Sequence, residues 1–446
     1  MPGPLPAGPW KTLPGPGGTS VPFYIVTFDE DGTCTSPATR DHLVGAAAGA
    51  TDVFLFSHGW NNDWAAATGA YDQFVSRYVP LRRAFWDPPT RPYRPVLVGV
   101  FWPSAVLVWP DERGPDFAGA EGPDDVATAQ ALAEMAAVAA RVDPASTARF
   151  YELAQRDGLT DDEAHELATI LAPALAGPGD EVGPAAAPTA EDLVGVWRDV
   201  GRRSGTAPAR TGGFIDDEPA GAAAPQVAGL LDWLKPRDII RAATVLLMKD
   251  RAGRVGAAGV GDLLRRLVDA SPDSRVHLVG HSYGGKVVLS ALTAGPAPGR
   301  LVESVLLLQP AMSALCFAPT VPGGGTGGYR PALDRVRQPL MTTFSAHDFP
   351  LTKAFHWAVR RPSDLGEAVI AGLPVPPSRY AALGGYGPQG VGAEVDVVAP
   401  RAAPNPYDVE PGGRRIIAVE ADDVISSHGD VQNDATAWAL LCQVMG

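Results

Sequence analysis

Short apolar runs recur along the chain and alternate with longer stretches that mix apolar and polar residues. Each run has the length of a β-strand and ends in polar residues or glycine. Continuous apolar runs of this kind are typical of parallel strands that are buried on both faces of a sheet. The alternation therefore predicts an α/β protein with a mostly parallel central sheet flanked by helices. The predicted strands span residues 21–28, 52–57, 96–101, 276–279, 304–308, 341–346 and 415–420.

Helical patterns lie between most of these strands. The helix predicted at 237–268 is long or broken, because four glycines fall in its middle and weaken it. An Asp31-Gly32 turn after the first strand predicts a β-hairpin that returns through residues 33–35. Further helices are predicted at residues 41–50, 64–78, 286–292 and 433–444.

The alternation is interrupted between residues 105 and 234, where helices and turns are predicted but no strand. Helices are expected at 127–142 and 148–156, and two more open at Thr160 and Thr189, the first with a capping box. This insertion holds 23 acidic and 8 basic residues, a net charge of −15, whereas the whole chain carries −14. The acidic excess therefore belongs to the insertion. It is interpreted either as a solvated face or as a lid that disfavours anionic substrates.

The predicted organisation is a discontinuous core with two insertions. The core comprises residues 21–104 and 235–446, and an irregular leader rich in proline and glycine, residues 1–20, precedes it. The acidic helical insertion, residues 105–234, is expected to form a cap. A second insertion, residues 350–412, is rich in glycine, proline and tyrosine and is predicted to be irregular.

Composition narrows the class of protein. A hydrophobic content of 46% and a charged content of 19% are those of an ordinary globular protein. The three cysteines are far apart, which suits a reducing compartment, and the first residues lack the features of a signal peptide. No apolar run approaches the ~20 residues that span a bilayer, so we expect a cytoplasmic protein without stable membrane insertion. A net charge of −14 without a basic stripe argues against nucleic-acid binding.

Metal and cofactor sites are not expected. The histidines show no paired spacing such as H-E-x-x-H, and the cysteines show no metal-ligand spacing. The glycine-rich residues 323–328 lack the Lys-Ser/Thr that completes a phosphate-binding loop. The sequence does not indicate an oligomeric state.

The stretch 276–287 carries the clearest chemical motif. Gly280-His281-Ser282-Tyr283-Gly284 is a G-x-S-x-G pentapeptide between a predicted strand and a predicted helix. In such a nucleophile elbow the turn lifts the serine above the sheet in a strained conformation, and the residues two positions away must lack side chains. The flanking strand and helix favour Ser282 as a nucleophile over a structural serine in a glycine-rich turn.

A serine nucleophile needs a histidine as base and a carboxylate that orients the histidine. Asp348 follows the strand predicted at 341–346, and His428 lies in the loop after the last predicted strand. The chain order Ser282, Asp348, His428 is the one that a nucleophile elbow of this kind requires. The sequence therefore predicts a Ser-His-Asp site at the strand ends.

Other residues near these positions are weaker candidates. Asp422 and Asp423 could orient the base only if its own loop folded back, and His347 is badly placed to reach round the neighbouring acid. His281 and His277 are interpreted as residues packed in or on the sheet. The remaining histidines are expected on the surface: His42, His165 and His356. Four tryptophans near the expected site are interpreted as core or lid packing, or as the wall of an apolar acyl pocket: Trp60, Trp64, Trp102 and Trp109.

These motifs resemble a serine hydrolase of the α/β-hydrolase superfamily, of the esterase or lipase type. Besides the pentapeptide and Asp348, the resemblance rests on His58-Gly59-Trp60-Asn61 and His428-Gly429-Asp430. It covers residues 21–104 and 236–446 and does not extend to the acidic insertion. The paired H-G-W-N-N and W-P-S motifs resemble a bacterial branch whose substrates they do not assign.

The resemblance implies an α/β-hydrolase fold with a large helical cap and a catalytic triad of Ser282, Asp348 and His428. It also implies an oxyanion hole formed by the backbone N–H groups of Trp60 and Tyr283. The expected reaction is cleavage of an ester, or of a thioester or amide, in a small acyl substrate through an acyl-enzyme. Two alternatives stay open: an acyltransferase or peptidase with the same triad, and a non-catalytic interaction protein that keeps the fold. The substrate-binding residues are not indicated.

Overall fold

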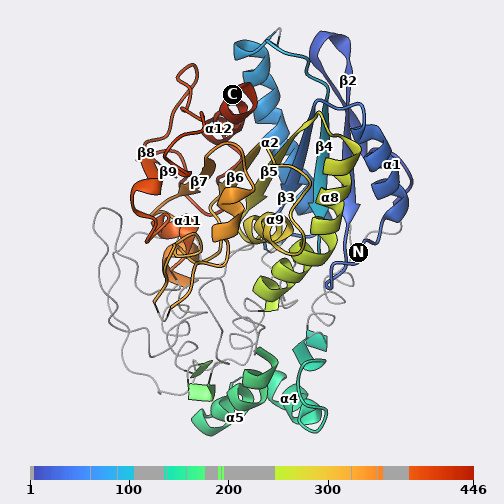
Figure 1. The fold of residues 1–446 in the computed structure, drawn as a ribbon. Helices are drawn as coiled ribbons and strands as arrows, with labels where there is room; N and C mark the ends of the chain where they lie inside the picture. The colour runs from blue at the N-terminus through green and yellow to red at the C-terminus, as the bar shows by residue number, and fades with distance from the viewer. Residues whose placement is uncertain are drawn as a thin grey trace, which may run out of the picture.

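The computed structural model describes residues 5–104 except 61 and 88, 135–175 except 137 and 157, 189–194 except 192, 247–354 except 323 and 349, and 381–446. Its centre is a nine-stranded mixed sheet in the order β1-β2-β4-β3-β5-β6-β7-β9-β8 (Figure 1). Strand β1 runs antiparallel to β2, and every other neighbouring pair is parallel. The strands are β1 Lys11–Pro14, β2 Ser20–Thr27, β3 Asp52–Ser57, β4 Pro95–Phe101, β5 Arg275–His281, β6 Ser304–Leu308, β7 Leu340–Phe344, β8 Val395–Val398 and β9 Ile416–Glu420.

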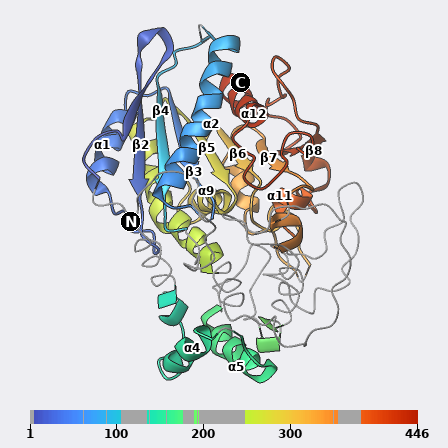
Figure 2. The ribbon, with the colours of Figure 1, turned by 180° about the vertical axis from the view of Figure 1, so that it is seen from behind.

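Helices cover both faces of the sheet. One face carries α1 (Pro37–Ala47), the π-helical segment η4 (Val255–Val260), α8 (Gly261–Ala270) and α9 (Tyr283–Thr293), in front in Figure 1. The other carries α2 (Trp64–Phe85) and α12 (Asp434–Met445), and α2 comes to the front in Figure 2. Shorter helical segments are η1 (Pro16–Gly18), η3 (Ala172–Leu175), η5 (Arg330–Asp334), η6 (Pro350–Ala354), α11 (Leu383–Tyr386) and η8 (Gly392–Glu394).

The apolar runs of the sequence become strands that are buried on both sides. In β3, Val53 and Leu55 belong to the apolar cluster under α1, α8 and α9, whereas Phe54 and Phe56 belong to the cluster under α2 and α12. Successive side chains of a strand point to opposite faces, so a strand between two helical layers must be apolar throughout. The predicted α/β class with a mostly parallel sheet is confirmed.

All seven predicted strands are present, and β3 and β6 have the predicted ends. Two further strands lie in segments that were predicted to be irregular: β1 in the leader and β8 in the insertion 350–412. Both are four-residue edge strands with exposed or half-exposed residues, so neither has the apolar run of a buried strand. The predicted hairpin after β2 is reduced to one bridge between Phe28 and Cys34, whereas the antiparallel partner of β2 is β1, at the other end of the strand.

The glycines of the predicted long helix have a packing role. Residues 247–270 form a continuous helix whose middle is η4, and residues 237–246 lie outside the described part. A Cβ on Gly256 would lie 2.4 Å from the carbonyl oxygen of Val287 in α9, and one on Gly259 would lie 2.2 Å from that of Gly32. The glycines therefore let this helix approach α9 and the loop after β2 closely.

Helix α2 extends beyond its predicted end. A proline inside a helix usually breaks it, yet α2 continues past Pro80 to Phe85. The ring of Phe85 packs edge-on against Trp438 of α12, with centroids 5.3 Å apart. Packing between the two helices thus outweighs the local preference.

The described part of the acidic insertion contains α4 (Thr147–Ala154) and α5 (Asp161–Leu171). The predicted capping box at Thr160 is present, with Glu163 as its second member. Both helices lie beyond the carboxyl ends of the strands (Figures 1 and 2). Their apolar cluster includes Leu247, which joins them to the helix that packs on the sheet. Residues 127–134 of one predicted helix and residues 195–234 lie outside the described part.

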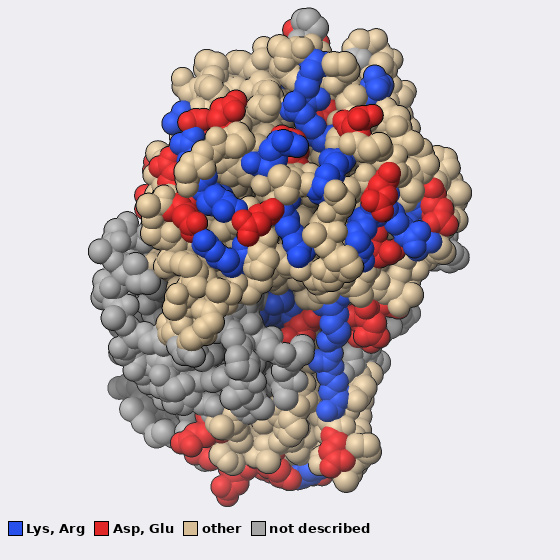
Figure 3. Space-filling model, in the orientation of Figure 1, with Lys and Arg blue, Asp and Glu red and all other residues tan. Residues whose placement is uncertain are grey.

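Charge on the described surface follows the sequence. Acidic side chains gather over α4 and α5 at the lower end of Figure 3, whereas acidic and basic side chains alternate over the face of the core. The searched residues contain no helix that is both long and apolar enough to cross a membrane.

Candidate active site

The serine of the pentapeptide stands in a strained turn between β5 and α9. Ser282 has a φ of 55° and a ψ of −126°, and residues other than glycine rarely adopt a positive φ. A Cβ on Gly280 would lie 2.6 Å from the carbonyl oxygen of Gly284, and a Cβ on Gly284 would lie 2.1 Å from that of Ser57. The two glycines therefore let the turn pack against the end of β3 while it presents the serine, as the motif predicted.

The structure brings the three predicted triad residues into one hydrogen-bonded chain. Oγ of Ser282 lies 2.9 Å from Nε2 of His428, and Nδ1 of His428 lies 2.7 Å from Oδ2 of Asp348. Ser282 is 3% exposed and Asp348 is fully buried, whereas the His428 side chain is 24% exposed. The three residues follow β5, β7 and β9, so parallel strands deliver them to the same edge of the sheet.

Both carboxylate oxygens of Asp348 have fixed partners. Oδ1 accepts a hydrogen bond from the backbone N–H of Leu351 at 3.0 Å, and Oδ2 accepts one from Nε2 of Gln309 at 3.0 Å in addition to His428. The carbonyl oxygen of Asp348 accepts from the backbone N–H and the hydroxyl of Thr352, at 2.8 and 2.7 Å. Asp348 thus caps the helical segment η6 from two residues before its start, and its carboxylate is turned toward His428.

The rival acids and the rival base are not part of this chain. Asp422 accepts a hydrogen bond from the backbone N–H of Ala346 at 2.8 Å and braces the loop that carries Asp348. Asp423 and His347 are exposed. Since the histidine of the chain bonds to Asp348 instead, the geometry favours the predicted acid.

His281 makes a contact that the sequence did not reveal. Packing against the sheet was expected, but Nε2 of His281 lies 2.9 Å from the backbone carbonyl oxygen of His428 and donates to it. The two ring centroids are 5.0 Å apart. Burial, together with the charge of His428, lowers the pKa of His281 to about 3, so His281 is neutral near neutral pH. The strand that ends at the nucleophile therefore also holds the loop of His428.

The loop after β3 lies against the serine and is fixed by His58. A Cβ on Gly59 would lie 2.6 Å from Cβ of Ser282, so the backbone of Gly59 touches the serine. Nε2 of His58 accepts a hydrogen bond from the backbone N–H of Trp102 at 3.3 Å, and Nδ1 donates to the carbonyl oxygen of Gly59 at 2.8 Å. Burial lowers the pKa of His58 to about 4, which matches a neutral ring that donates at one nitrogen and accepts at the other.

The two predicted oxyanion-hole residues lie beside Ser282. Trp60 directly follows Gly59, and Tyr283 is the first residue of α9. The backbone N–H groups at the start of a helix carry partial positive charge and attract anions. The position of Tyr283 therefore suits a negative charge that develops next to the serine, and Trp60 follows the glycine that touches the serine.

Three of the four tryptophans near the site are described. Trp102 is buried and stacks on the ring of His58, with centroids 5.5 Å apart, and Trp64 packs edge-on against Phe101 at 5.1 Å. Trp109 lies outside the described residues. The packing interpretation fits Trp102 and Trp64, and an acyl-pocket wall stays a hypothesis.

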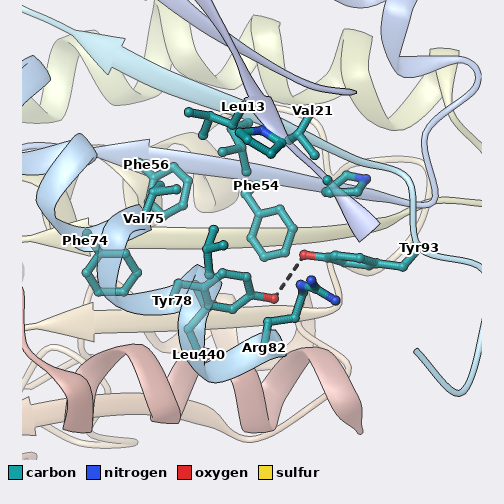
Figure 4. Close-up of a pocket in the computed structure, with 15 residues that line it drawn as sticks. Leu13, Val21, Phe54, Phe56, Phe74, Val75, Tyr78, Arg82, Tyr93 and Leu440 are labelled. Carbon is teal, nitrogen blue, oxygen red and sulfur yellow. Dashed lines mark hydrogen bonds between the residues drawn. The ribbon is translucent and has the colours of Figure 1, made fainter. Parts of the chain in front are cut away.

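An apolar cavity lies on the α2 face of the sheet, away from the serine (Figure 4). Phe54, Tyr78 and Tyr93 are among its lining residues, and the two tyrosine hydroxyls lie 3.0 Å apart. Its volume is about 30 Å³, whereas ligand pockets have roughly 300–1,000 Å³. The cavity is therefore a packing space and not a substrate site.

A second Asp-His-Ser set lies at the amino ends of the strands. His277 is 2.8 Å from Oγ of Ser304 through Nδ1 and 3.3 Å from Oδ1 of Asp52 through Nε2, and Arg91 binds both oxygens of Asp52 at 2.6 and 2.8 Å. Burial by itself would raise the pKa of Asp52, but the hydrogen bonds from Arg91 and His277 hold it well below its usual range. Asp52, His277 and Ser304 are fully buried, so no substrate reaches them. The set is structural, in line with the core role expected for His277.

The chain of Ser282, His428 and Asp348, which is partly exposed at His428, can move a proton. Its histidine can take the proton of the serine hydroxyl through Nε2 while Asp348 holds Nδ1–H, which makes the serine oxygen a nucleophile. The searched residues contain no group of three or more His, Cys, Asp or Glu side chains that could hold a metal ion.

Sequence reasoning missed Gln309 and the contact of His281 with the base loop. Both residues stand at the carboxyl end of a predicted strand, and this position was the one available signal. Comparisons with protein-family models, with curated proteins and with solved structures each found no significant match, so the site is interpreted from its own geometry.

Proposed function

We propose that this protein is a serine hydrolase of the α/β-hydrolase superfamily that cleaves a carboxylic ester, or a thioester or amide, through an acyl-enzyme on Ser282. The observation that carries the proposal is the hydrogen-bonded chain from Ser282 through His428 to Asp348, with distances of 2.9 and 2.7 Å. The strained serine and the donors beside it support the same conclusion.

The hydrogen bonds define the working form of His428. An ionised Asp348 only accepts, so Nδ1 of His428 carries the proton and Nε2 presents its lone pair to the hydroxyl of Ser282. Oγ of Ser282 then attacks the acyl carbon as its proton passes to Nε2. The imidazolium returns that proton to the leaving group as the acyl–oxygen bond breaks, and water repeats the sequence to release the acid.

The oxyanion is assigned to the backbone N–H groups of Trp60 and Tyr283. Tyr283 begins α9, so the charge at the helix amino terminus adds to its N–H. Each preorganised donor of this kind lowers the barrier by roughly 3–4 kcal/mol. His58 is neutral and hydrogen-bonded through both ring nitrogens, and it keeps the loop of Gly59 and Trp60 against the serine.

The substrate is a small acyl compound that reaches the site past the cap. The triad residues follow the carboxyl ends of β5, β7 and β9, and α4 and α5 lie beyond these strand ends, so we assign the approach of substrate to that side. We assign the acidic insertion, residues 105–234, as a cap whose charge disfavours anionic substrates.

Labelling with a fluorophosphonate tests this function. The wild-type protein should be labelled at Ser282 and should hydrolyse activated esters, and Ser282→Ala should abolish both while it keeps the circular dichroism spectrum. Ser304→Ala is the matched control, because Ser304 also bonds to a histidine that bonds to an aspartate but is fully buried. Labelling that persists in Ser282→Ala would refute the assignment, as would a wild-type protein that no activated ester or phosphonate modifies.

A further inference from the structure

Gln309 is a strained and fully buried residue next to the proposed acid. It follows β6 with a φ of 43°, and it is 0% exposed. Among the residues that the structure describes, only Ser282 and Gln309 combine a side chain with a positive φ. Strained backbone persists where surrounding contacts enforce it, and it gathers at functional sites. The strained backbone of Ser282 is explained by the turn that presents the proposed nucleophile, whereas the strained backbone of Gln309 needs its own explanation.

The hydrogen bonds of Gln309 leave one orientation for its amide group. Nε2 lies 3.0 Å from Oδ2 of Asp348 and 3.1 Å from the carbonyl oxygen of Gly384, and both of these atoms are acceptors. The hydroxyl of Thr343 donates to Oε1 at 2.9 Å and accepts from the backbone N–H of Gln309 at 3.0 Å. A flipped amide would face two acceptors with its oxygen, so Gln309 is an obligatory donor to Asp348.

This donor competes with His428 for the same carboxylate oxygen. Oδ2 of Asp348 accepts from Nδ1 of His428 at 2.7 Å and from Gln309 at 3.0 Å. A hydrogen bond to a carboxylate stabilises its negative charge, so less of that charge is left to stabilise a proton on the neighbouring imidazole. Gln309 carries no charge, so it draws on the carboxylate without neutralising it. A base that holds its proton less tightly is neutral over a wider range of pH.

We propose that Gln309 is a positioning residue that fixes the carboxylate of Asp348 toward His428 and weakens its hold on the protonated imidazole. The proposal deepens the proposed function and rests on it for its catalytic meaning. Gln309 touches no reacting atom and acts through Asp348 alone. The positive φ lets the side chain turn back from the end of β6 to the loop after β7.

The titratable groups around His428 decide whether its own titration can be observed separately. Among the described residues they include Asp348 after β7, His281 on β5 and His58 after β3, with Asp422, Asp423 and Asp430 on the loop of His428 itself. Burial lowers the pKa of His281 to about 3 and that of His58 to about 4, so both rings are neutral at and above pH 5. A titration between pH 5 and 8 that is seen at His428 therefore reports on His428 and its carboxylate.

Gln309→Met tests the proposal, because methionine fills the space of glutamine without its donor. The full-length protein, with ¹⁵N in its histidine rings, is titrated by NMR, and the acid limb of the pH–rate profile for an activated ester is measured in parallel. We expect the midpoint of His428 and the acid limb to move together to higher pH by about 0.5 unit, since the carboxylate loses a donor. We also expect kcat to fall roughly tenfold, because the carboxylate is less well positioned.

Gln443→Met is the matched control. Gln443 is a fully buried glutamine of α12 whose Nε2 donates to the carbonyl oxygen of Val305, away from the triad. It should lower thermal stability without moving either midpoint. Thr343→Val covers the case in which Gln309→Met does not fold. It removes the hydroxyl that bonds to Oε1 and to the backbone N–H of Gln309, so the donor to Asp348 is held less firmly and the midpoint should shift in the same direction by less.

The outcomes separate this proposal from the proposed function. Unchanged midpoints in both Gln309→Met and Thr343→Val, or a shift of equal size in Gln443→Met, would overturn the role of Gln309. A wild-type protein that is not labelled at Ser282 would overturn the hydrolase assignment, and the NMR titration would still decide whether Gln309 acts on the Asp348–His428 pair.

Discussion

Two adjacent glycines at the start of α9 provide a sharp test of the crowding in the serine turn. A Cβ on Gly284 would lie 2.1 Å from the carbonyl oxygen of Ser57, whereas a Cβ on Gly285 would lie 2.9 Å from the terminal methyl of Met312. Real Cβ atoms essentially never approach closer than 3.0 Å. Alanine at 284 must therefore move backbone by about 0.9 Å. Alanine at 285 displaces the end of a flexible side chain and presses slightly on Cβ of Pro310, which would lie 3.3 Å away.

The magnitudes follow from two opposing effects. Replacing a helical glycine with alanine stabilises a helix by about 1 kcal/mol, and this stabilisation applies to both Gly284→Ala and Gly285→Ala. Overpacking typically costs about 1–3 kcal/mol, and Gly284→Ala should lie at or above the upper end because the blocking atom belongs to the backbone of β3. We expect Gly285→Ala to stay within about 1 kcal/mol of the wild type and Gly284→Ala to lose about 2–3 kcal/mol.

Thermal and urea unfolding of the two variants measure this difference. At about 2 °C per kcal/mol for a chain of this size, Gly284→Ala should melt about 4–6 °C below the wild type. Its fluorophosphonate labelling should also slow, because the end of β3 carries the loop of Gly59 that touches Ser282. Equal stability and equal labelling of the two variants would refute the account of the turn as a sterically closed contact between β3 and α9.

Substitutions at two further positions, Asp52 and His281, test the buried polar contacts. Asp52→Asn should lower the free energy of unfolding by about 3–5 kcal/mol at pH 7, because it leaves the partly buried Arg91 without its charged partner. Since the pKa of Asp52 is lowered in the folded state, its contribution is present above the unfolded value of about 4 and fades as the pH falls below it. Urea unfolding at pH 7 and pH 3 should therefore show a difference that shrinks at pH 3, and a constant difference would contradict the linkage. His281→Leu should slow labelling of Ser282 roughly tenfold, because the loop of His428 loses a hydrogen bond, whereas His281→Gln retains a donor and should stay closer to the wild type. Identical rates for these two variants would show that the donor is unimportant.

The predictable parts of this protein are those with a local signature. Buried strands are visible in the sequence as apolar runs, so both ends of β3 and of β6 are predicted correctly. The pentapeptide around Ser282 has a fixed spacing that follows from local crowding. Strand β8 has neither feature, because an edge strand of four exposed or half-exposed residues pairs with one neighbour only and needs no apolar run.

Side-chain contacts between distant segments were harder to predict. His281 was expected to pack on the sheet, yet its partner lies 147 positions away in the loop of His428. Gln309 meets Asp348 from 39 positions away, through a backbone conformation that glutamine does not prefer. A local pattern cannot show such pairs, because the contact exists only once the parallel strands have set their loops side by side.

The sequence by itself determined the α/β class, the positions of the buried strands and the residues that a Ser-His-Asp site would use. Periodicity, turn chemistry and motif spacing are local properties, and one chain is enough to reveal them. The tertiary structure decided which carboxylate meets the histidine, which donors hold that carboxylate, and that the second Asp-His-Ser set is sealed in the core. These outcomes depend on distances and burial that arise when strands far apart in the chain become neighbours in one sheet, and no local pattern encodes them.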